Sequence, residues 1–128
     1  GALAATPSTA WADKTFTCRF TGTWVGTNEK WLFDAKYIAK DGVDTFTGIY
    51  ELPGTSRADV SGNAAKGNWK ILLTYTDSKH KGMQKVLTGQ GMRNPGTNLV
   101  RIDGTFKTLV SGTDSKADGK FSLLGQCK

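Results

Sequence analysis

Apolar and polar residues alternate through most of this chain, in short runs rich in β-branched and aromatic side chains. The alternation is plain between residues 31 and 37, where the apolar positions share one face: Trp31, Phe33, Ala35 and Tyr37. A period of two is typical of strands with one buried face, and no segment shows convincing helical periodicity. The pattern predicts eight strands, at residues 15–25, 31–39, 45–52, 58–62, 68–76, 84–93, 98–110 and after residue 119.

Turn residues separate these runs and leave little chain between them. Asp41-Gly42, Pro53-Gly54 and Asn94-Pro95-Gly96 are turn signals, and small or polar residues predict loops at 63–67 and 111–119. Connections this short suit antiparallel neighbours, because parallel pairing needs a longer crossover. We therefore predict an all-β fold, an eight-stranded antiparallel up-and-down β-barrel, whose interior holds side chains or one small ligand.

A glycine recurs inside these runs. Its five copies are Phe20-Thr21-Gly22-Thr23-Trp24, Phe46-Thr47-Gly48-Ile49-Tyr50, Leu87-Thr88-Gly89-Gln90-Gly91, Ile102-Asp103-Gly104-Thr105-Phe106 and Leu124-Gly125-Gln126-Cys127. A lone glycine within a strand marks a bulge, a bend or a close approach of two backbones. One such glycine per strand indicates a small closed barrel.

The chain length sets the domain organisation. With 128 residues, of which 38% are hydrophobic, the chain has enough apolar surface for one modest core. We expect residues 1–14 to form a flexible N-terminal arm, because they are mostly small residues, and residues 15–128 to form a single barrel domain. The apolar runs are far shorter than the roughly 20 residues that cross a bilayer, and no secretory leader is evident, so we expect a mature chain with no membrane span.

The charge is basic but dispersed. Seventeen Lys and Arg against eleven Asp and Glu give a net charge of +6 and a pI near 9.5. The closest cluster, Lys79, His80, Lys81 and Lys85, is expected in a solvated hairpin loop, with a nucleic-acid site as the alternative. No basic helix or aromatic-basic sheet signature is evident, so we expect no specific nucleic-acid partner.

Two cysteines lie near the ends of the predicted barrel. The period of two places Cys18 and Cys127 on the apolar faces of the first and last strands. If these strands pair to close the barrel, the sulfurs can form a disulfide, worth roughly 4 kcal/mol in the chain-entropy model. That outcome favours an oxidising, extracellular setting for a secreted protein. Two separate buried thiols in a cytosolic protein are the alternative.

Catalytic residues are not evident. The single histidine, His80, lies between two lysines, and nothing obvious in the sequence orients it. The carboxylates fall mainly at predicted turns, at Asp41, Asp77, Asp114 and Asp118 among others. No metal-ligand spacing occurs. We therefore expect a non-enzymatic protein with no catalytic residue, metal or cofactor.

Several segments resemble the avidin and streptavidin family of calycin-like barrels. Cys18–Trp24 is similar to the first strand of that family, Phe46–Tyr50 to the third and Leu87–Gln90 to the sixth. Residues 101–125 resemble the last two strands with their loop. The resemblance covers about residues 18–126, with a shortened region after the third strand, and implies an avidin-like barrel.

The resemblance also implies a ligand site at the barrel mouth. Tyr50 matches a ligand of the ureido oxygen of biotin, Tyr75 stands at an aromatic wall position, and Phe106 replaces a tryptophan wall. Gly26 replaces an expected asparagine, so Thr27 or Asn28 would have to reach inward from the same loop. The site lacks other family residues, with these replacements: Leu52 for serine, Leu87 for tryptophan, Gly119 for the tryptophan that caps a neighbouring subunit, and Cys127 for aspartate. Each buried ureido atom left without a partner would cost about 1–3 kcal/mol, so the resemblance implies a degenerate biotin site.

The aromatic residues also admit a purely structural interpretation, as the core of a small barrel. We expect Trp24 to be core. At least one of Trp31 and Trp69 is expected to be partly exposed, where it would serve a partner or a subunit interface.

Three functions stay open from the sequence. The first is a secreted protein that binds a small molecule or glycan, in the manner of a lectin, with weak biotin binding as its variant. The second is a secreted inhibitor or effector with a sealed core and a protein partner. The third is an electrostatic binder of anionic polymers, and a homo-oligomer stays open for all three.

Overall fold

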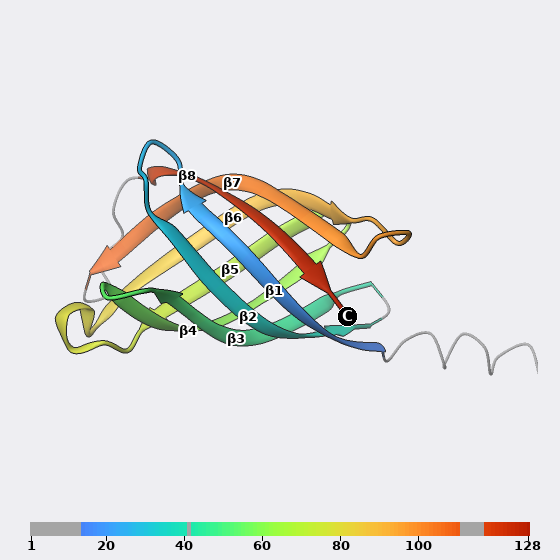
Figure 1. The fold of residues 1–128 in the computed structure, drawn as a ribbon, viewed down its shortest axis with the longest axis horizontal. Helices are drawn as coiled ribbons and strands as arrows, with labels where there is room; N and C mark the ends of the chain where they lie inside the picture. Colours follow the sequence, from blue (N-terminus) through green and yellow to red (C-terminus); the bar gives the residue numbers. More distant parts are fainter. Residues whose placement is uncertain (1–13, 41, 111–116) are drawn as a thin grey trace, which may run out of the picture.

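Eight antiparallel strands close into one barrel in the computed structural model, which describes residues 14–40, 42–110 and 117–128 (Figure 1). Each strand pairs with the next, and β8 pairs with β1. The strands are β1 Lys14–Trp24, β2 Lys30–Ala39, β3 Asp44–Leu52, β4 Ser56–Ala65, β5 Asn68–Tyr75, β6 Met83–Arg93, β7 Leu99–Val110 and β8 Ala117–Cys127. A short 3-10 turn, η2 (Ser78–His80), lies between β5 and β6. The predicted all-β, up-and-down barrel is confirmed.

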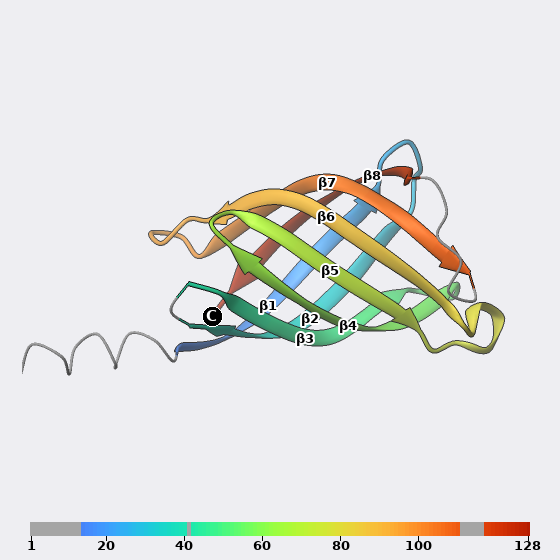
Figure 2. The same ribbon diagram turned by 180° about the vertical axis from the view of Figure 1, so that it is seen from behind.

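The strand connections gather at the two ends of the barrel, as the two opposite views show (Figures 1 and 2). We call one end the mouth. It carries the β1–β2 and β3–β4 connections and the β5–β6 connection with η2. The other end, the base, carries the turns that follow β2, β4 and β6, and the chain ends there after β8. Inward residues near the mouth therefore lie beside its connections, where a ligand could enter the barrel.

Strand β4 is longer than predicted. It runs from Ser56 to Ala65 rather than over residues 58–62, and its second half pairs with β5 through the Ala64–Trp69 register. The expected loop at 63–67 shrinks to the turn Lys66-Gly67, in which both residues have positive φ, 52° and 80°. Gly, Asn and Ala have low β propensity, but pairing to both neighbours within a closed barrel overrides it.

Three predictions at the chain ends and loops concern residues outside those described. The expected N-terminal arm lies outside the described residues, apart from Lys14, which begins β1. Asp41 of the predicted Asp41-Gly42 turn and residues 111–116 of the predicted last loop are also outside. Strand β8 begins at Ala117, before the end of the predicted loop.

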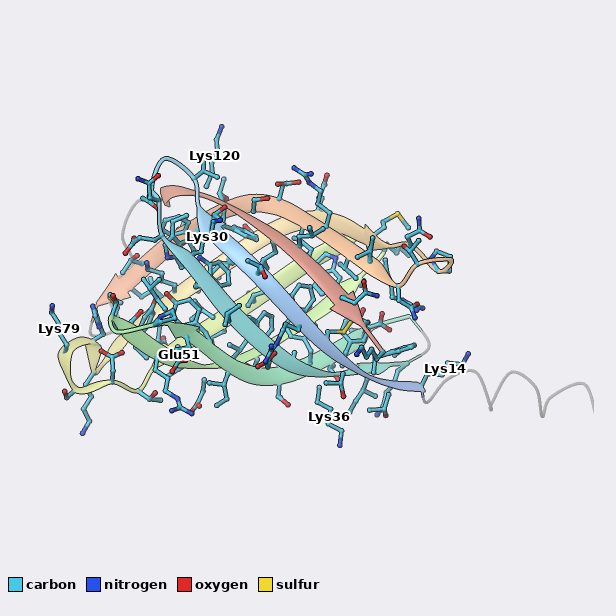
Figure 3. The ribbon with its side chains drawn as sticks, viewed as in Figure 1. Lys14, Lys30, Lys36, Glu51, Lys79 and Lys120 are labelled. Atoms are coloured by element: carbon cyan, nitrogen blue, oxygen red, sulfur yellow. A yellow bond between two sulfur atoms is a disulfide. The ribbon has the colours of Figure 1, made fainter. Side chains whose placement is uncertain are left out.

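The core fills the inside of the barrel with alternate residues of every strand. Side chains with less than 4% exposure come from each strand in turn: Phe20, Phe33, Tyr50, Val60, Ile71, Leu87, Ile102 and Leu123. Most charged side chains lie on the outer faces, and Lys36 and Lys120 point away from the barrel (Figure 3). The alternation read from the sequence is therefore the alternation of inside and outside.

Trp31 and Trp69 are both core residues, so the expectation that one of them is partly exposed was wrong. Their exposed fractions are 1% and 5%. Trp31 packs between the rings of Trp24 and Tyr50, with centroid separations of 4.7 and 5.2 Å. The indole nitrogen of Trp69 donates a hydrogen bond to the carbonyl oxygen of Gly91 at 2.9 Å. The barrel accepts the ring of Trp31 because Gly22 on the neighbouring strand leaves room for it.

The recurring glycines mark close approaches, as the sequence predicted, although β2 and β5 carry none. A Cβ atom on Gly22 would lie 2.5 Å from the ring of Trp31. A Cβ atom on Gly48 would overlap the carbonyl oxygen of Asp34 on the paired strand. Absence of a side chain at these positions therefore allows both the aromatic packing and the close approach of neighbouring strands.

A disulfide joins the two strands that close the barrel. Cys18 and Cys127 are directly paired in the β1–β8 register, both side chains are buried, and their sulfurs are bonded. The predicted disulfide is confirmed. It spans 109 residues of sequence and fixes the one seam that joins the first strand to the last.

The close approach at Gly48 gives a first prediction. Gly48→Ala should lower the free energy of unfolding by about 2–3 kcal/mol, because the added methyl group meets backbone that cannot move alone. The matched variant Gly96→Ala, whose Cβ would meet only the end of the Asn94 side chain at 3.3 Å, should change it by about 0.5 kcal/mol or less. Urea unfolding followed by circular dichroism measures both. Equal effects of the two variants would contradict the packing argument.

The disulfide gives a second prediction. Reduction should lower the free energy of unfolding by about 4 kcal/mol, since the bond restricts a long loop in the unfolded chain. Urea titrations of the protein with and without dithiothreitol measure the loss, and the Cys18→Ala/Cys127→Ala double variant should match the reduced protein closely. An unchanged unfolding midpoint after complete reduction would show that strand pairing alone holds the seam.

Candidate functional site

A cavity of about 160 Å³ opens at the mouth of the barrel. Its lining includes aromatic, hydroxyl and charged side chains from five strands, η2 and the β1–β2 connection: Trp24, Glu29, Tyr50, Ser56, Tyr75, His80 and Lys85. Sites for drug-sized ligands are larger, about 300–1,000 Å³, whereas a cavity of about 150 Å³ holds one benzene molecule. The cavity therefore suits a ligand, or part of a ligand, the size of one ring.

Aromatic rings form the inner walls of this cavity. The ring of Trp24 lies 4.7 Å from that of Phe106, measured between centroids. Tyr50 meets Tyr75 edge to face at 5.7 Å. Such rings offer flat apolar faces, and the phenol and indole groups add polar edges.

Hydroxyl groups converge within these walls. The hydroxyl oxygens of Tyr50 and Ser56 are 3.2 Å apart, and Ser56 is the one buried polar residue among those described. Burial raises the pKa of Tyr50, although hydrogen bonds with Ser56, Tyr75 and Trp24 oppose the rise. Burial also raises the pKa of Tyr75, with a smaller contribution from the neighbouring Tyr50. Both phenols therefore stay protonated at neutral pH and are able to donate hydrogen bonds.

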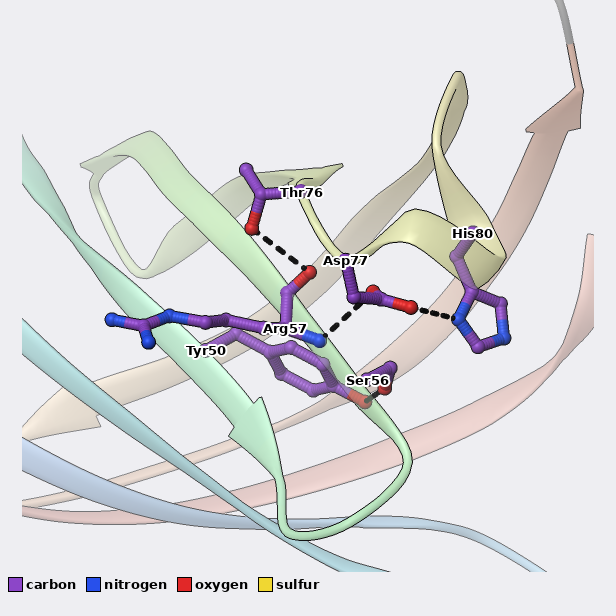
Figure 4. Close-up of polar contacts among 6 residues, drawn as sticks. All are labelled: Tyr50, Ser56, Arg57, Thr76, Asp77 and His80. Atoms are coloured by element: carbon purple, nitrogen blue, oxygen red, sulfur yellow. Dashed lines mark hydrogen bonds and ion pairs between the residues drawn. The ribbon is translucent and has the colours of Figure 1, made fainter.

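The β5–β6 connection is fastened to the edge of the cavity by Asp77 (Figure 4). One carboxylate oxygen accepts a hydrogen bond from the backbone N–H of Arg57 at 3.0 Å, and the other accepts one from Nδ1 of His80 at 2.6 Å. The Arg57 amide is the main cause of the lowered pKa of Asp77, and His80 adds to it. The expectation that nothing orients His80 was wrong. Asp77 holds the His80 ring 5.6 Å from the ring of Tyr75, measured between centroids.

Lys85 is half-buried on strand β6 and lines the cavity at the mouth, rather than lying in a solvated loop. It lies on β6 two residues before the buried Leu87, on the same inward face. Its ammonium nitrogen is 4.3 Å from the ring centroid of Trp24 and 5.0 Å from that of Phe106. Lys79 remains in the connection between β5 and β6 and points to solvent (Figure 3). The spacing of two residues between Lys85 and Leu87 would have predicted that both side chains point inward. The sequence analysis instead grouped Lys85 with the nearby basic residues of the loop.

The structure brings together some of the residues proposed from the sequence. Tyr50 and Tyr75 line the cavity, and Phe106 packs against Trp24 behind it. The hydroxyl of Thr27 donates to the carbonyl oxygen of Trp24 at 2.8 Å and accepts from the backbone N–H of Glu29 at 3.2 Å, so it shapes its own loop. Asn28 is exposed, and its neighbour Glu29 lines the cavity instead.

Sequence reasoning missed Ser56. The family resemblance calls for a hydroxyl at position 52, which is Leu52 here, and Ser56 on the next strand brings a hydroxyl to Tyr50. The shortened prediction for β4 left Ser56 outside the strand, where its direction could not be inferred. A strand beginning at Ser56 would have placed it inward with Ala58 and Val60.

Within residues 14–40, 42–110 and 117–128, no three or more His, Cys, Asp or Glu side chains are grouped so that they could hold a metal ion. No helix in these ranges has the length and apolar character needed to span a bilayer.

No protein-family model matches this chain, and neither a curated protein nor a solved structure does. The short motifs quoted above thus remain the source of the avidin-like resemblance. Arguments about function rest on the cavity, its rings and its polar groups.

The tyrosines give a third prediction. The pKa of Tyr37, Tyr50 and Tyr75 is raised in each case, first by burial, from an ordinary value near 10.0. Folding therefore keeps these phenols protonated, and the resulting stability is complete below about pH 10 and is lost as the pH rises further. Absorbance at 295 nm should show no tyrosine ionising near pH 10 in the folded protein, and ionisation should accompany alkaline unfolding. A tyrosine that titrates near pH 10 before unfolding would contradict this.

Proposed function

We propose that this chain is a secreted, non-enzymatic binding protein that holds a small ring-shaped ligand, such as one sugar unit of a glycan, in the barrel mouth. The observation that supports this most directly is the cavity itself. Its aromatic walls surround the paired hydroxyls of Tyr50 and Ser56. Aromatic faces with a few convergent polar groups are typical of small-molecule sites.

The chemistry of the walls favours a ring with polar substituents. A sugar ring has apolar faces that pack on aromatic side chains, and hydroxyl groups that exchange hydrogen bonds. The protonated phenols of Tyr50 and Tyr75 are able to donate such bonds in a largely desolvated place. The size of the cavity, about 160 Å³, limits the buried part of the ligand to about one ring.

We propose further that the barrel is an avidin-like one whose biotin site is degenerate. The order of the resembling motifs and the inward position of Tyr50 support this origin. Biotin carries two fused rings and a side chain, for which the cavity is small. Leu52 and Leu87 also provide no polar group for it. Biotin should therefore bind weakly.

The disulfide and the environment of His80 support the remaining parts of the proposal. Structural disulfides persist in oxidising compartments, and the Cys18–Cys127 bond is buried within the barrel seam. The His80–Asp77 pair fastens a connection to β4 through the backbone of Arg57. A structural use of this pair favours binding over acid–base catalysis at the mouth.

The Tyr50 hydroxyl provides the test. Tyr50→Phe should weaken binding of the best ligand by roughly three- to tenfold, because the hydroxyl that lies 3.2 Å from that of Ser56 is removed and its hydrogen bond to the ligand is lost. The matched variant Tyr37→Phe removes a hydroxyl bonded to Asp44 at the base, and should leave binding unchanged. Melting temperatures of the oxidised protein with monosaccharides and biotin identify the ligand, and calorimetric titration gives the affinities.

Three results would contradict the proposal. If no compound raises the melting temperature, the alternative of a sealed core with a protein partner is favoured. If Tyr37→Phe weakens binding as much as Tyr50→Phe, the hydroxyl effect is a general loss of stability. Tight biotin binding would show that the site is not degenerate.

A further inference from the structure

A second hollow lies on the outside of the barrel, away from the mouth. It is an open groove of about 660 Å³ over β4, β5 and β6, which are neighbours in the barrel wall (Figure 2). Lys66 of the β4–β5 turn lines it, so the groove belongs to the base half of the molecule. A molecule bound there would leave the mouth open. The polar side chains of the lining are all exposed: Asn63, Lys66, Asn68, Lys70, Thr88 and Gln90.

The strand register arranges most of these side chains in two rows. Asn63, Lys70 and Thr88 lie opposite one another across β4, β5 and β6. Asn68 and Gln90 form the next row, in which Nε2 of Gln90 donates a hydrogen bond to Oδ1 of Asn68 at 3.5 Å. This bond leaves the amide NH₂ group of Asn68 as a donor, and Oε1 of Gln90 as an acceptor, for a ligand.

The charge of the groove is positive. Lys66 and Lys70 contribute two ammonium groups, and within the described ranges no Asp or Glu side chain is among the lining residues. Exposed lysines keep their hydration and their charge, so no cost of burial opposes them here. The groove thus presents two cations among amide and hydroxyl groups.

Two carboxylates near the groove have partners of their own. Asp103, opposite Gln90 on β7, accepts a hydrogen bond from Nε of Arg101 at 3.2 Å. Asp44, at the base, accepts one from the hydroxyl of Tyr37 and one from the backbone N–H of Lys40. Neither carboxylate lines the groove.

The side chains of the groove fit a ligand that is both anionic and rich in hydroxyl groups. Ammonium groups bind anionic oxygens, whereas amides and threonine exchange hydrogen bonds with hydroxyls. Binding of single-stranded nucleic acid uses aromatic rings on which bases stack, and the ring in this lining, that of Trp69, is 5% exposed. We propose that the groove binds an acidic polysaccharide, with Lys66 and Lys70 as partners of its sulfate or carboxylate groups. This second site does not depend on the ligand of the mouth.

Two pairs of polymers test the ligand class. Dextran sulfate against dextran represents sulfate esters, and polygalacturonate against its methyl ester represents carboxylates. At least one acidic polymer should bind the oxidised, full-length chain about fivefold or more tightly than its neutral partner, and salt should weaken that binding because the ion pairs are exposed. The pair that shows the preference identifies the anionic group. Biolayer interferometry measures the affinities.

Substitution of both lysines tests the site. Lys66→Gln/Lys70→Gln should weaken binding of the acidic polymer by about fivefold, as expected for the loss of two exposed ion pairs. The matched control, Lys30→Gln/Lys36→Gln, removes the same charge from two exposed lysines of β2 and should weaken it by less than about twofold. Circular dichroism checks that both double variants fold.

Three results would overturn the inference. Equal affinity for the acidic and neutral polymers would show that charge plays no part. An equal loss in the two double variants would show that binding follows the net charge alone. Single-stranded DNA that binds more tightly than either acidic polymer, and is released by Lys66→Gln/Lys70→Gln, would make the ligand a nucleic acid. Tyr50→Phe should leave polysaccharide binding unchanged, and a loss there would place the polymer at the mouth instead.

Discussion

The pairing of β1 with β8 turns a row of hairpins into a barrel, and the cavity at the mouth depends on that closure. The register sets Cys18 against Cys127 near the base and Trp24 against Phe121 near the mouth. A slip of one residue would turn the inner side chains of a strand outward. Because the disulfide ties the two cysteines directly, it supports the β1–β8 register in which Trp24, a wall of the cavity, lies opposite Phe121.

Inside this closed wall, aromatic rings and glycines share a limited space. In the middle of the barrel, the ring of Phe20 contacts the rings of both Phe33 and Trp69. The ring of Phe20 occupies the place where a Gly125 side chain would lie. Toward the mouth the packing changes, because inward positions there carry the shorter Ser56 and the charged Lys85. The cavity lies where dense apolar packing gives way to polar groups.

Alternation and turn residues were enough to predict the barrel, since every strand is buried on one face only. Alternation also placed Cys18 inward, and the family resemblance proposed Tyr50 and Tyr75 for the mouth, where both line the cavity. Ser56 and Lys85 were missed for related reasons. Ser56 lies in a turn-rich segment and Lys85 lies close to a run of basic residues. In both cases the local composition was given more weight than the period of two that places these side chains inward. The Asp77–His80 contact was beyond reach, because it depends on how the β5–β6 connection folds back on Arg57.

These polar positions bear on the choice between a sealed core and a binding site. A barrel that needed only a stable interior would gain from apolar side chains at positions 56 and 85, as replacement of buried polar groups by well-packed apolar ones is often neutral or stabilising. The neighbouring inward residues Met83 and Leu87 show that β6 accommodates such side chains there. Among the described residues, the buried indole nitrogen of Trp31, next to Trp24 and Tyr50, also lacks a hydrogen-bond partner. Ser56, Lys85 and the unpartnered indole nitrogen of Trp31 thus lie at the same end of the barrel, in or next to the cavity, which favours the proposed binding site over a sealed core.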